Sequence, residues 1–199
     1  MPPLHRSALA DDPIDQFRDW YERAAKEVPL VDAMALATVD RDASPDARMV
    51  LLKGFGADGF RFFTNLASAK ARQLEAFPRG ALILYWRELD RQVRIRGEIE
   101  KLPAADDDEY FATRPTEARL GAWASPQSTP LPSREALDER LREVTERFAG
   151  GDVPRPEFWG GYLLRPDRIE FWQGQAARLH DRFMYTREGE GWRIERLAP

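Results

Sequence analysis

Short segments in which apolar and polar residues alternate recur along this chain, and they limit the folds that it can adopt. The segment 91–102 is the clearest case, because Val93, Ile95 and Ile99 stand at even spacing and share one face of an extended strand. Further strands are predicted at 33–39, 47–53, 59–64, 81–86, 159–164, 168–173, 182–186 and 192–196. Tight turns between many of them favour an antiparallel barrel or sandwich of roughly six to eight strands.

Helical patterns lie between and around these strands. The first helix is predicted to begin at Pro13 with Asp12 as its N-cap and to stop before Pro29. Others are predicted at 69–77, 104–113, 115–123 and 133–148. No βαβ rhythm and no glycine-rich Rossmann or P-loop motif is present. The sequence therefore predicts a mainly β fold with helices, as a single domain over 12–199 after a flexible N-terminal tail over 1–11.

The composition excludes several classes of function. The 199 residues include no cysteine and two histidines, which excludes thiol catalysis, disulfides and the usual three-histidine zinc site. A net charge of −4 argues against nucleic-acid binding. No apolar run approaches the roughly 20 residues that span a bilayer, and the N-terminus lacks an apolar signal core. A cytoplasmic protein that binds neither membrane nor nucleic acid is expected.

Cations and polar side chains gather at the ends of two predicted strands. Arg48 and Lys53 are five residues apart, so a regular strand would place them on opposite faces and joint action requires a bend or a strand end. Thr64 ends another strand, and Ser68 then opens a helix that carries Lys70. Helix N-termini attract phosphate, which favours an anion site here. The alternatives are solvated strand-end charges and simple helix capping.

Three weaker signals follow along the chain. Tyr110 and Arg114 are four residues apart and share a helix face, whereas Gln127 and Ser128 lie in a proline-rich loop. If the run 178–182 is extended, its three basic residues share one face and Leu179 and Phe183 point into the core; the alternative is a solvated edge strand. Trp172 is a candidate wall for an aromatic ligand. An inventory of phosphate-binding cations without a nucleophile suits an enzyme whose cofactor performs the chemistry.

Nine segments together resemble one known family. The chain contains, in order, RMVLLKGF, FFTNLASAK, DRQVRIRGEIEKL, EYFATRP, GAWASPQS, FWGGYLL, IEFWQG, RLHDRF and WRIERLAP. From about residue 12 to the end it resembles the pyridoxine/pyridoxamine 5′-phosphate oxidase family. The resemblance implies an FMN-binding split β-barrel of antiparallel Greek-key strands, in a homodimer with FMN between the subunits. It also implies oxidation of pyridoxine or pyridoxamine 5′-phosphate by O2 to pyridoxal 5′-phosphate and H2O2.

The same resemblance assigns roles to individual residues. Expected FMN ligands are Arg48, Lys53, Thr64, Ser68, Lys70, Gln92, Gln127, Ser128, Trp172 and Arg182. Expected substrate ligands are Lys53, Tyr110, Arg114, Arg178 and His180. Arg178 and His180 are also the expected catalytic residues, because they would orient the substrate ring against the flavin. No metal is expected.

The chain departs from the family pattern at a few positions. Ala69 stands where the family commonly has an arginine beside the FMN phosphate, and Arg72, one turn along, is expected to compensate in part. Ala118 replaces a serine near the substrate phosphate, and the run before Arg178 is less polar than in many relatives. Two alternatives stay open: a related flavin oxidase acting on another reduced aromatic such as a dihydrophenazine, and a non-catalytic protein that binds flavin or pyridoxal phosphate.

Overall fold

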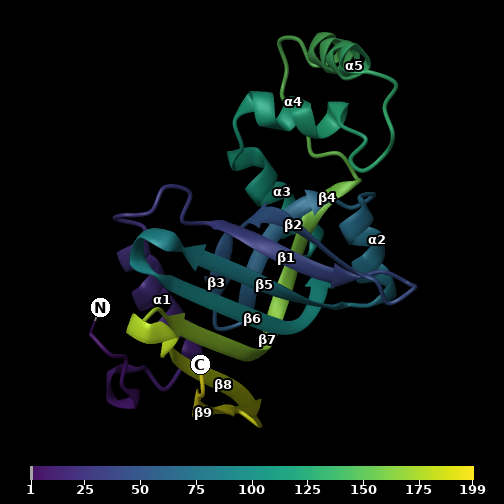
Figure 1. Cartoon of the computed structure of the whole chain (residues 1–199). Coiled ribbons are helices and arrows are strands. Elements are labelled where there is room, and N and C mark those ends of the chain that lie inside the picture. The colour runs from purple at the N-terminus through teal and green to yellow at the C-terminus, as the bar shows by residue number, and fades with distance from the viewer. Residues whose placement is uncertain (1) are drawn as a thin grey trace.

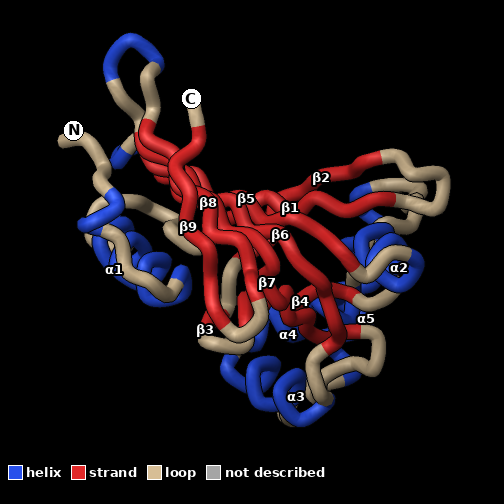
Figure 2. The backbone as a smooth tube through the Cα atoms, turned by 90° about the horizontal axis from the view of Figure 1, so that it is seen from below, coloured by secondary structure: helices blue, strands red, loops and turns tan. Residues whose placement is uncertain are grey.

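The computed structural model describes residues 2–199. Its strands, along which buried and exposed residues alternate, form one antiparallel sheet (Figures 1 and 2). Its order is β2-β1-β5-β6-β7-β4-β3, and β8 pairs with both β7 and β9. The strands are β1 (Ala33–Val39), β2 (Pro45–Leu51), β3 (Gly54–Gly56), β4 (Gly59–Asn65), β5 (Arg79–Trp86), β6 (Arg91–Lys101), β7 (Trp159–Gln173), β8 (Asp181–Glu188) and β9 (Gly191–Leu197). The predicted mainly β, antiparallel fold is confirmed. The sheet has nine strands rather than six to eight.

The long strand β7 divides the sheet into two parts. Its first six residues pair with β4 and its last six with β8, while β6 pairs along both halves. The ladder shifts register between Arg96 and Gly97, where a Cβ on Gly97 would lie 1.9 Å from the carbonyl oxygen of Arg165. Only glycine fits this close approach. The sequence predicted two strands at 159–164 and 168–173, but pairing with β6 continues through Pro166 and joins them.

Helix α1 (Pro13–Ala24) covers one opening of the barrel-like sheet. The Asp12 carboxylate accepts the backbone N–H of Ile14 at 2.7 Å, as expected for the N-cap. Phe17 is fully buried, and its ring centroid lies 4.9 Å from that of Phe60 on β4. Full burial of such a side chain contributes about 1.5–3 kcal/mol to stability, so α1 is tied to the sheet by its apolar face.

The remaining helices lie away from α1. Helix α2 (Ala69–Ala76) follows β4, and α3 (Ala104–Thr113), α4 (Thr116–Ala124) and α5 (Arg134–Arg147) form an excursion between β6 and β7 (Figure 1). These ranges agree with the predicted helices to within a residue or two. Helix α5 has no buried residue and is the outermost element of the excursion. None of the helices in residues 2–199 is long and apolar enough to cross a membrane.

The segment 2–10 makes definite contacts with the C-terminal strands. Leu4 and Leu9 are buried, the backbone N–H of Leu4 donates to the Asp181 carboxylate at 2.9 Å, and the Tyr185 hydroxyl donates to the Ala10 carbonyl at 2.7 Å. These contacts differ from the loose attachment expected of a tail over 1–11, whose first residue, Met1, lies outside the described residues. The mobility of this segment and the single domain over 12–199 stay predictions, to be tested by proteolysis and hydrogen exchange.

Candidate active site

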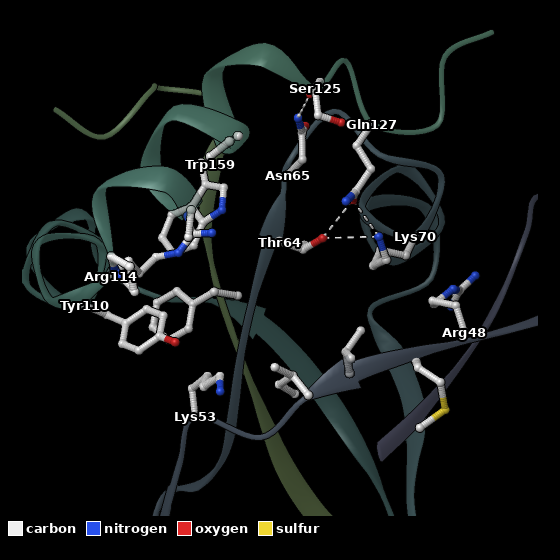
Figure 3. Close-up of a pocket in the computed structure, with 18 of the residues that line it drawn as sticks. Arg48, Lys53, Thr64, Asn65, Lys70, Tyr110, Arg114, Ser125, Gln127 and Trp159 are labelled. Atoms are coloured by element: carbon white, nitrogen blue, oxygen red, sulfur yellow. Dashed lines mark hydrogen bonds between the residues drawn. The ribbon is translucent and has the colours of Figure 1, made fainter. Parts of the chain in front are cut away.

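A cleft of about 890 Å³ opens between the ends of β2 and β4 and the helical excursion. It brings together seven of the residues expected to bind ligands (Figure 3): Arg48, Lys53, Thr64, Lys70, Tyr110, Arg114 and Gln127. They come from β2, β4, α2, α3 and the loops after β2, α3 and α4. The basic groups stand at two ends of the cleft: Arg48 and Lys70 at one, Lys53 and Arg114 at the other.

At the first end, Lys70 is held among neutral oxygen atoms. Its Nζ donates to Gln127 Oε1 at 2.8 Å, to Thr64 Oγ1 at 3.1 Å and to Ser68 Oγ at 3.3 Å. Burial, aided by the positive charge of Arg48, lowers the pKa of Lys70 to about 8. No carboxylate is in that hydrogen-bonded set, so the site favours an incoming anion.

Helix α2 adds to this end of the cleft. Its N-cap, Ser68, is fully buried, does not line the cleft, makes no side-chain capping bond and accepts a hydrogen bond from Lys70 instead. Ala69 leaves no cation at the first position, and Arg72 donates instead to the carbonyl of Ala67. Arg72 and Ala69 line a second, smaller cavity together, and neither lines the main cleft.

At the other end, Arg114 is a half-buried cation without a hydrogen-bond partner on one nitrogen. Its Nη1 is buried and unpaired among the described residues, and burial lowers the pKa of its guanidinium. The guanidinium carbon lies 4.8 Å from the ring centroid of Trp159, which holds it by a cation–π contact. A buried, unpaired N–H is costly, so a phosphate oxygen fits this position.

Aromatic rings form the wall beside Arg114. Phe63 stacks on Tyr110 with ring centroids 4.1 Å apart and on Trp159 at 5.3 Å. Phe63 and Trp159 were not among the predicted residues. The alternation of side chains along β4 could have identified Phe63, because Phe63 lies on the face opposite to the buried Phe60 and Phe62.

The bend that the sequence required between Arg48 and Lys53 is present. Strand β2 ends at Leu51, and the backbone N–H of Lys53 then donates to the carbonyl of Arg61 at 2.8 Å. The chain turns from β2 toward β4 there, so both cations line one cleft. Lys53 Nζ also pairs with the Asp32 carboxylate at 2.7 Å.

A second group of predicted residues lies outside the cleft of the described chain. Gln92, Trp172 and Arg182 are direct cross-strand neighbours on β6, β7 and β8. Tyr85 on β5 pairs with Gln92 and continues this row, with a relative exposure of 54%. On β2, which β1 separates from β5, Met49 is 65% exposed and also lines the cleft. This face of the sheet combines exposed apolar residues with predicted cofactor ligands, so it suits contact with a partner.

The run 178–182 is not an extended strand, and that prediction was wrong. Ala177 and Arg178 have φ angles of 55° and 62°, which turn the chain, and β8 begins only at Asp181. Leu179 is 69% exposed rather than buried, whereas Phe183 is buried as predicted. The predicted common face therefore does not form: Arg178 lies in a 3₁₀ turn, and only Arg182 belongs to the strand.

His180 lies just before this strand and beside Trp172, with ring centroids 4.6 Å apart. Its Nδ1 accepts the backbone N–H of Gln175 at 3.2 Å. That bond favours the tautomer in which Nε2 carries the proton and can donate to a ligand. Ser128, the remaining predicted ligand, follows Gln127 in its loop with a φ of 66° and is exposed, while its side chain is not part of the cleft wall. Among the described residues no cluster suits a metal ion.

Comparisons with known proteins agree with this geometry. Residues 21–148 match the family model described as pyridoxamine 5′-phosphate oxidase, and residues 159–199 match the pyridoxine 5′-phosphate oxidase C-terminal dimerisation region. Pyridoxine/pyridoxamine 5′-phosphate oxidase of Rubrobacter xylanophilus is 54% identical, over 98% of this chain and 92% of the relative. The enzyme of the same name from Anaeromyxobacter dehalogenans is 52% identical over 99% of this chain and its own full length.

Solved structures of two other proteins have the same fold as this chain. PhzG from Burkholderia lata 383, whose crystal structure contains tetrahydrophenazine-1-carboxylic acid, has a TM-score of 0.92 at 31% identity and 98% coverage of both chains. An FMN-binding protein of Nostoc punctiforme, related to pyridoxamine 5′-phosphate oxidase, has a TM-score of 0.77 at 19% identity, over 96% of this chain and all of its own. The split β-barrel is thereby confirmed. The chain belongs to the pyridoxine/pyridoxamine 5′-phosphate oxidase family.

Proposed function

We propose that this protein is an FMN-dependent oxidase that converts pyridoxine or pyridoxamine 5′-phosphate to pyridoxal 5′-phosphate. O2 is the final electron acceptor and leaves as H2O2, and the amine substrate also yields ammonia. The observation that carries the proposal is the cleft with two cationic ends, because cofactor and substrate each bring one phosphate. The matched relatives at 52–54% identity support the choice of substrate class.

The residues of the first end fit the FMN phosphate. Arg48 and Lys70 supply positive charge, Thr64 supplies a hydroxyl, and Ser68 accepts from Lys70 at the start of α2. Gln127 borders the site from its loop, where its Oε1 accepts from Lys70. When bound, FMN accepts a hydride from the substrate and passes the electrons to O2. The protein supplies binding and orientation.

The residues of the second end fit the substrate phosphate. Arg114 offers its unpaired Nη1 and Lys53 its ammonium, while the Tyr110 ring belongs to the stacked aromatic wall. A charge-assisted hydrogen bond to phosphate contributes about 1.5–3 kcal/mol. We assign these residues to substrate binding and Arg178 and His180 to orienting the pyridine ring, with Nε2 of His180 as the donor.

The protein is a homodimer, and we propose that each active site draws on both chains. In one chain Gln92, Trp172, Arg178, His180 and Arg182 stand apart from the cleft. Residues 159–199, which match a dimerisation region, carry all of these except Gln92. Placing this face of one subunit over the cleft of its partner would complete two equal sites. The cytoplasm is the proposed compartment, to be tested by cell fractionation.

A direct assay tests the activity. Purified protein is incubated with FMN and pyridoxine 5′-phosphate, and pyridoxal 5′-phosphate and peroxide are followed together. Equal amounts of both products support the proposal; FMN binding without turnover would indicate a carrier. A dihydrophenazine carboxylate serves as the comparison substrate, because PhzG is 31% identical. Faster oxidation of that compound would replace the proposed substrate.

A mixed dimer tests how the site is divided. Arg114→Ala and Arg178→Ala chains with different tags are co-expressed, and the mixed dimer is purified beside each homodimer. If Arg114 and Arg178 of one site come from different chains, one site of the mixed dimer is intact and about half of the wild-type activity returns. If both come from the same chain, each site carries a defect and activity stays at the level of the homodimers.

A further inference from the structure

A closed set of hydrogen bonds holds Arg48 at the edge of the cleft. Its Nη1 donates to Thr38 Oγ1 at 2.6 Å and to the Leu36 carbonyl at 3.1 Å. Its Nη2 donates to Asp46 Oδ2 at 2.6 Å and to Gln73 Oε1 at 2.8 Å. Four of the five guanidinium N–H groups are thus engaged, and the Nε–H is the one that remains for a ligand.

Thr38, Asp46 and Gln73 are also bonded to one another. The Thr38 hydroxyl donates to Gln73 Oε1 at 2.6 Å, and Gln73 Nε2 donates to Asp46 Oδ2 at 3.2 Å. The amide orientation of Gln73 is therefore determined from both sides. The set joins β1, β2 and α2, and it places Gln73 one helical turn after Lys70.

The partners of Arg48 differ in how firmly they are held. Thr38 is 2% exposed, whereas the side chain of Asp46 is 49% exposed. Hydrogen bonds from Gln73 and Arg48 keep the pKa of Asp46 below its usual range, so its carboxylate is ionised at neutral pH. Thr38 is fixed in the interior, while Asp46 can turn into solvent. One partner of Arg48 is therefore both charged and displaceable.

We propose that Asp46 is an internal counterion that competes with the FMN phosphate for Arg48, while Gln73 is a positioning residue that keeps the guanidinium at the cleft. The proposal rests on the assignment of Arg48 and Lys70 to the FMN phosphate. A phosphate arriving at Arg48 meets a carboxylate of like charge already on the same nitrogen. It binds fully only when Asp46 turns away, so Asp46 lowers the affinity for FMN and Gln73 raises it.

The two roles predict opposite mutational effects. An ion pair of this exposure contributes little by itself, so Asp46→Asn is expected to tighten FMN binding about fivefold. The asparagine retains a side-chain oxygen that can accept from Gln73. Gln73→Leu removes three hydrogen bonds from the set and loosens the guanidinium, and it is expected to weaken FMN binding about tenfold.

The experiment is a fluorescence titration of the full chain, freed of flavin, with FMN and in parallel with riboflavin, which lacks the phosphate. Asp42→Asn is the matched control, because it removes the same charge from the turn just before β2 and Asp42 makes no hydrogen bond to Arg48. We expect Asp46→Asn to lower the Kd for FMN and to leave the Kd for riboflavin unchanged. Asp42→Asn should change neither.

The outcomes separate this inference from the proposed function. An Asp46→Asn protein with unchanged or weaker FMN binding would overturn the counterion role, and so would an equal gain for riboflavin. An equal loss of both flavins in Gln73→Leu would overturn the positioning role. If the wild type binds no FMN, or if Arg48→Ala binds it as well as the wild type, the underlying phosphate assignment is wrong instead.

Discussion

The cleft differs in the pairing of its charged residues from the face of β6–β8 that carries Gln92, Trp172 and Arg182, here called the outer face. In the cleft, burial lowers the pKa values of Lys70 and Arg114, and Arg114 has a buried N–H without a partner. On the outer face, Arg182 donates to the buried Glu170 at 2.8 Å, and this bond raises its pKa. Lys70 and Arg114 therefore have no carboxylate partner until ligands arrive, whereas Arg182 on the outer face is already paired. The difference suggests that the cleft supplies affinity and the outer face supplies orientation.

The largest effect is expected in the loop before β8, where a substitution tests whether this part of the molecule supplies orientation. We expect Arg178→Ala to lower kcat about a hundredfold, because a misplaced substrate ring loses the benefit of alignment. The residue is exposed, so the melting temperature should stay near that of the wild type. His180→Ala should behave similarly and more mildly. A normal kcat with a raised KM would assign Arg178 to affinity and contradict the comparison.

Arg114→Ala tests whether the cleft supplies affinity for the substrate, and the measurement is KM. We expect KM for pyridoxine 5′-phosphate to rise about tenfold to a hundredfold, since one charge-assisted hydrogen bond to phosphate is lost. The Kd for FMN should be unchanged, because Arg114 lies at the other end of the cleft. Arg119→Ala is a control on the neighbouring helix α4, where the arginine pairs with Asp152. An unchanged KM in Arg114→Ala would remove this residue from the substrate site.

The lowered pKa of Lys70 predicts how FMN affinity depends on pH. In the free protein Lys70 loses its proton near pH 8, and a bound phosphate favours the protonated form. Binding above this pH must take up a proton, so the Kd should be flat below pH 8 and rise above it. From pH 7.5 to 9 we expect an increase of about eightfold. Lys70→Arg should flatten the profile, and a flat wild-type profile would show that Lys70 does not meet the phosphate.

Local pattern predicted most of the fold and the composition of the cleft. The alternation in β6 and the N-cap of α1 depend on nearby residues, and they were predicted correctly. The turn at Ala177 and Arg178 was missed, because nothing in those two residue types requires a positive φ. The single strand β7 was also missed, since its middle is held by pairing with β6, a partner distant in sequence. The hydrogen-bonded set around Arg48 likewise joins three elements and leaves no local signal.

The smallest expected effect concerns Ala69, at the start of α2. An arginine there would add a cation beside the FMN phosphate, and we expect Ala69→Arg to tighten FMN binding by about 1 kcal/mol, or roughly fivefold. Arg72, the residue expected from its spacing to compensate, donates to the Ala67 carbonyl and lines the smaller cavity instead of the cleft. In this position it acts on the phosphate only through a screened field. A double-mutant cycle of FMN dissociation constants at fixed salt should therefore give nearly additive effects for Ala69→Arg and Arg72→Ala. A loss of FMN affinity in Arg72→Ala that disappears once residue 69 is arginine would show that Arg72 leaves the Ala67 carbonyl and takes over the missing role.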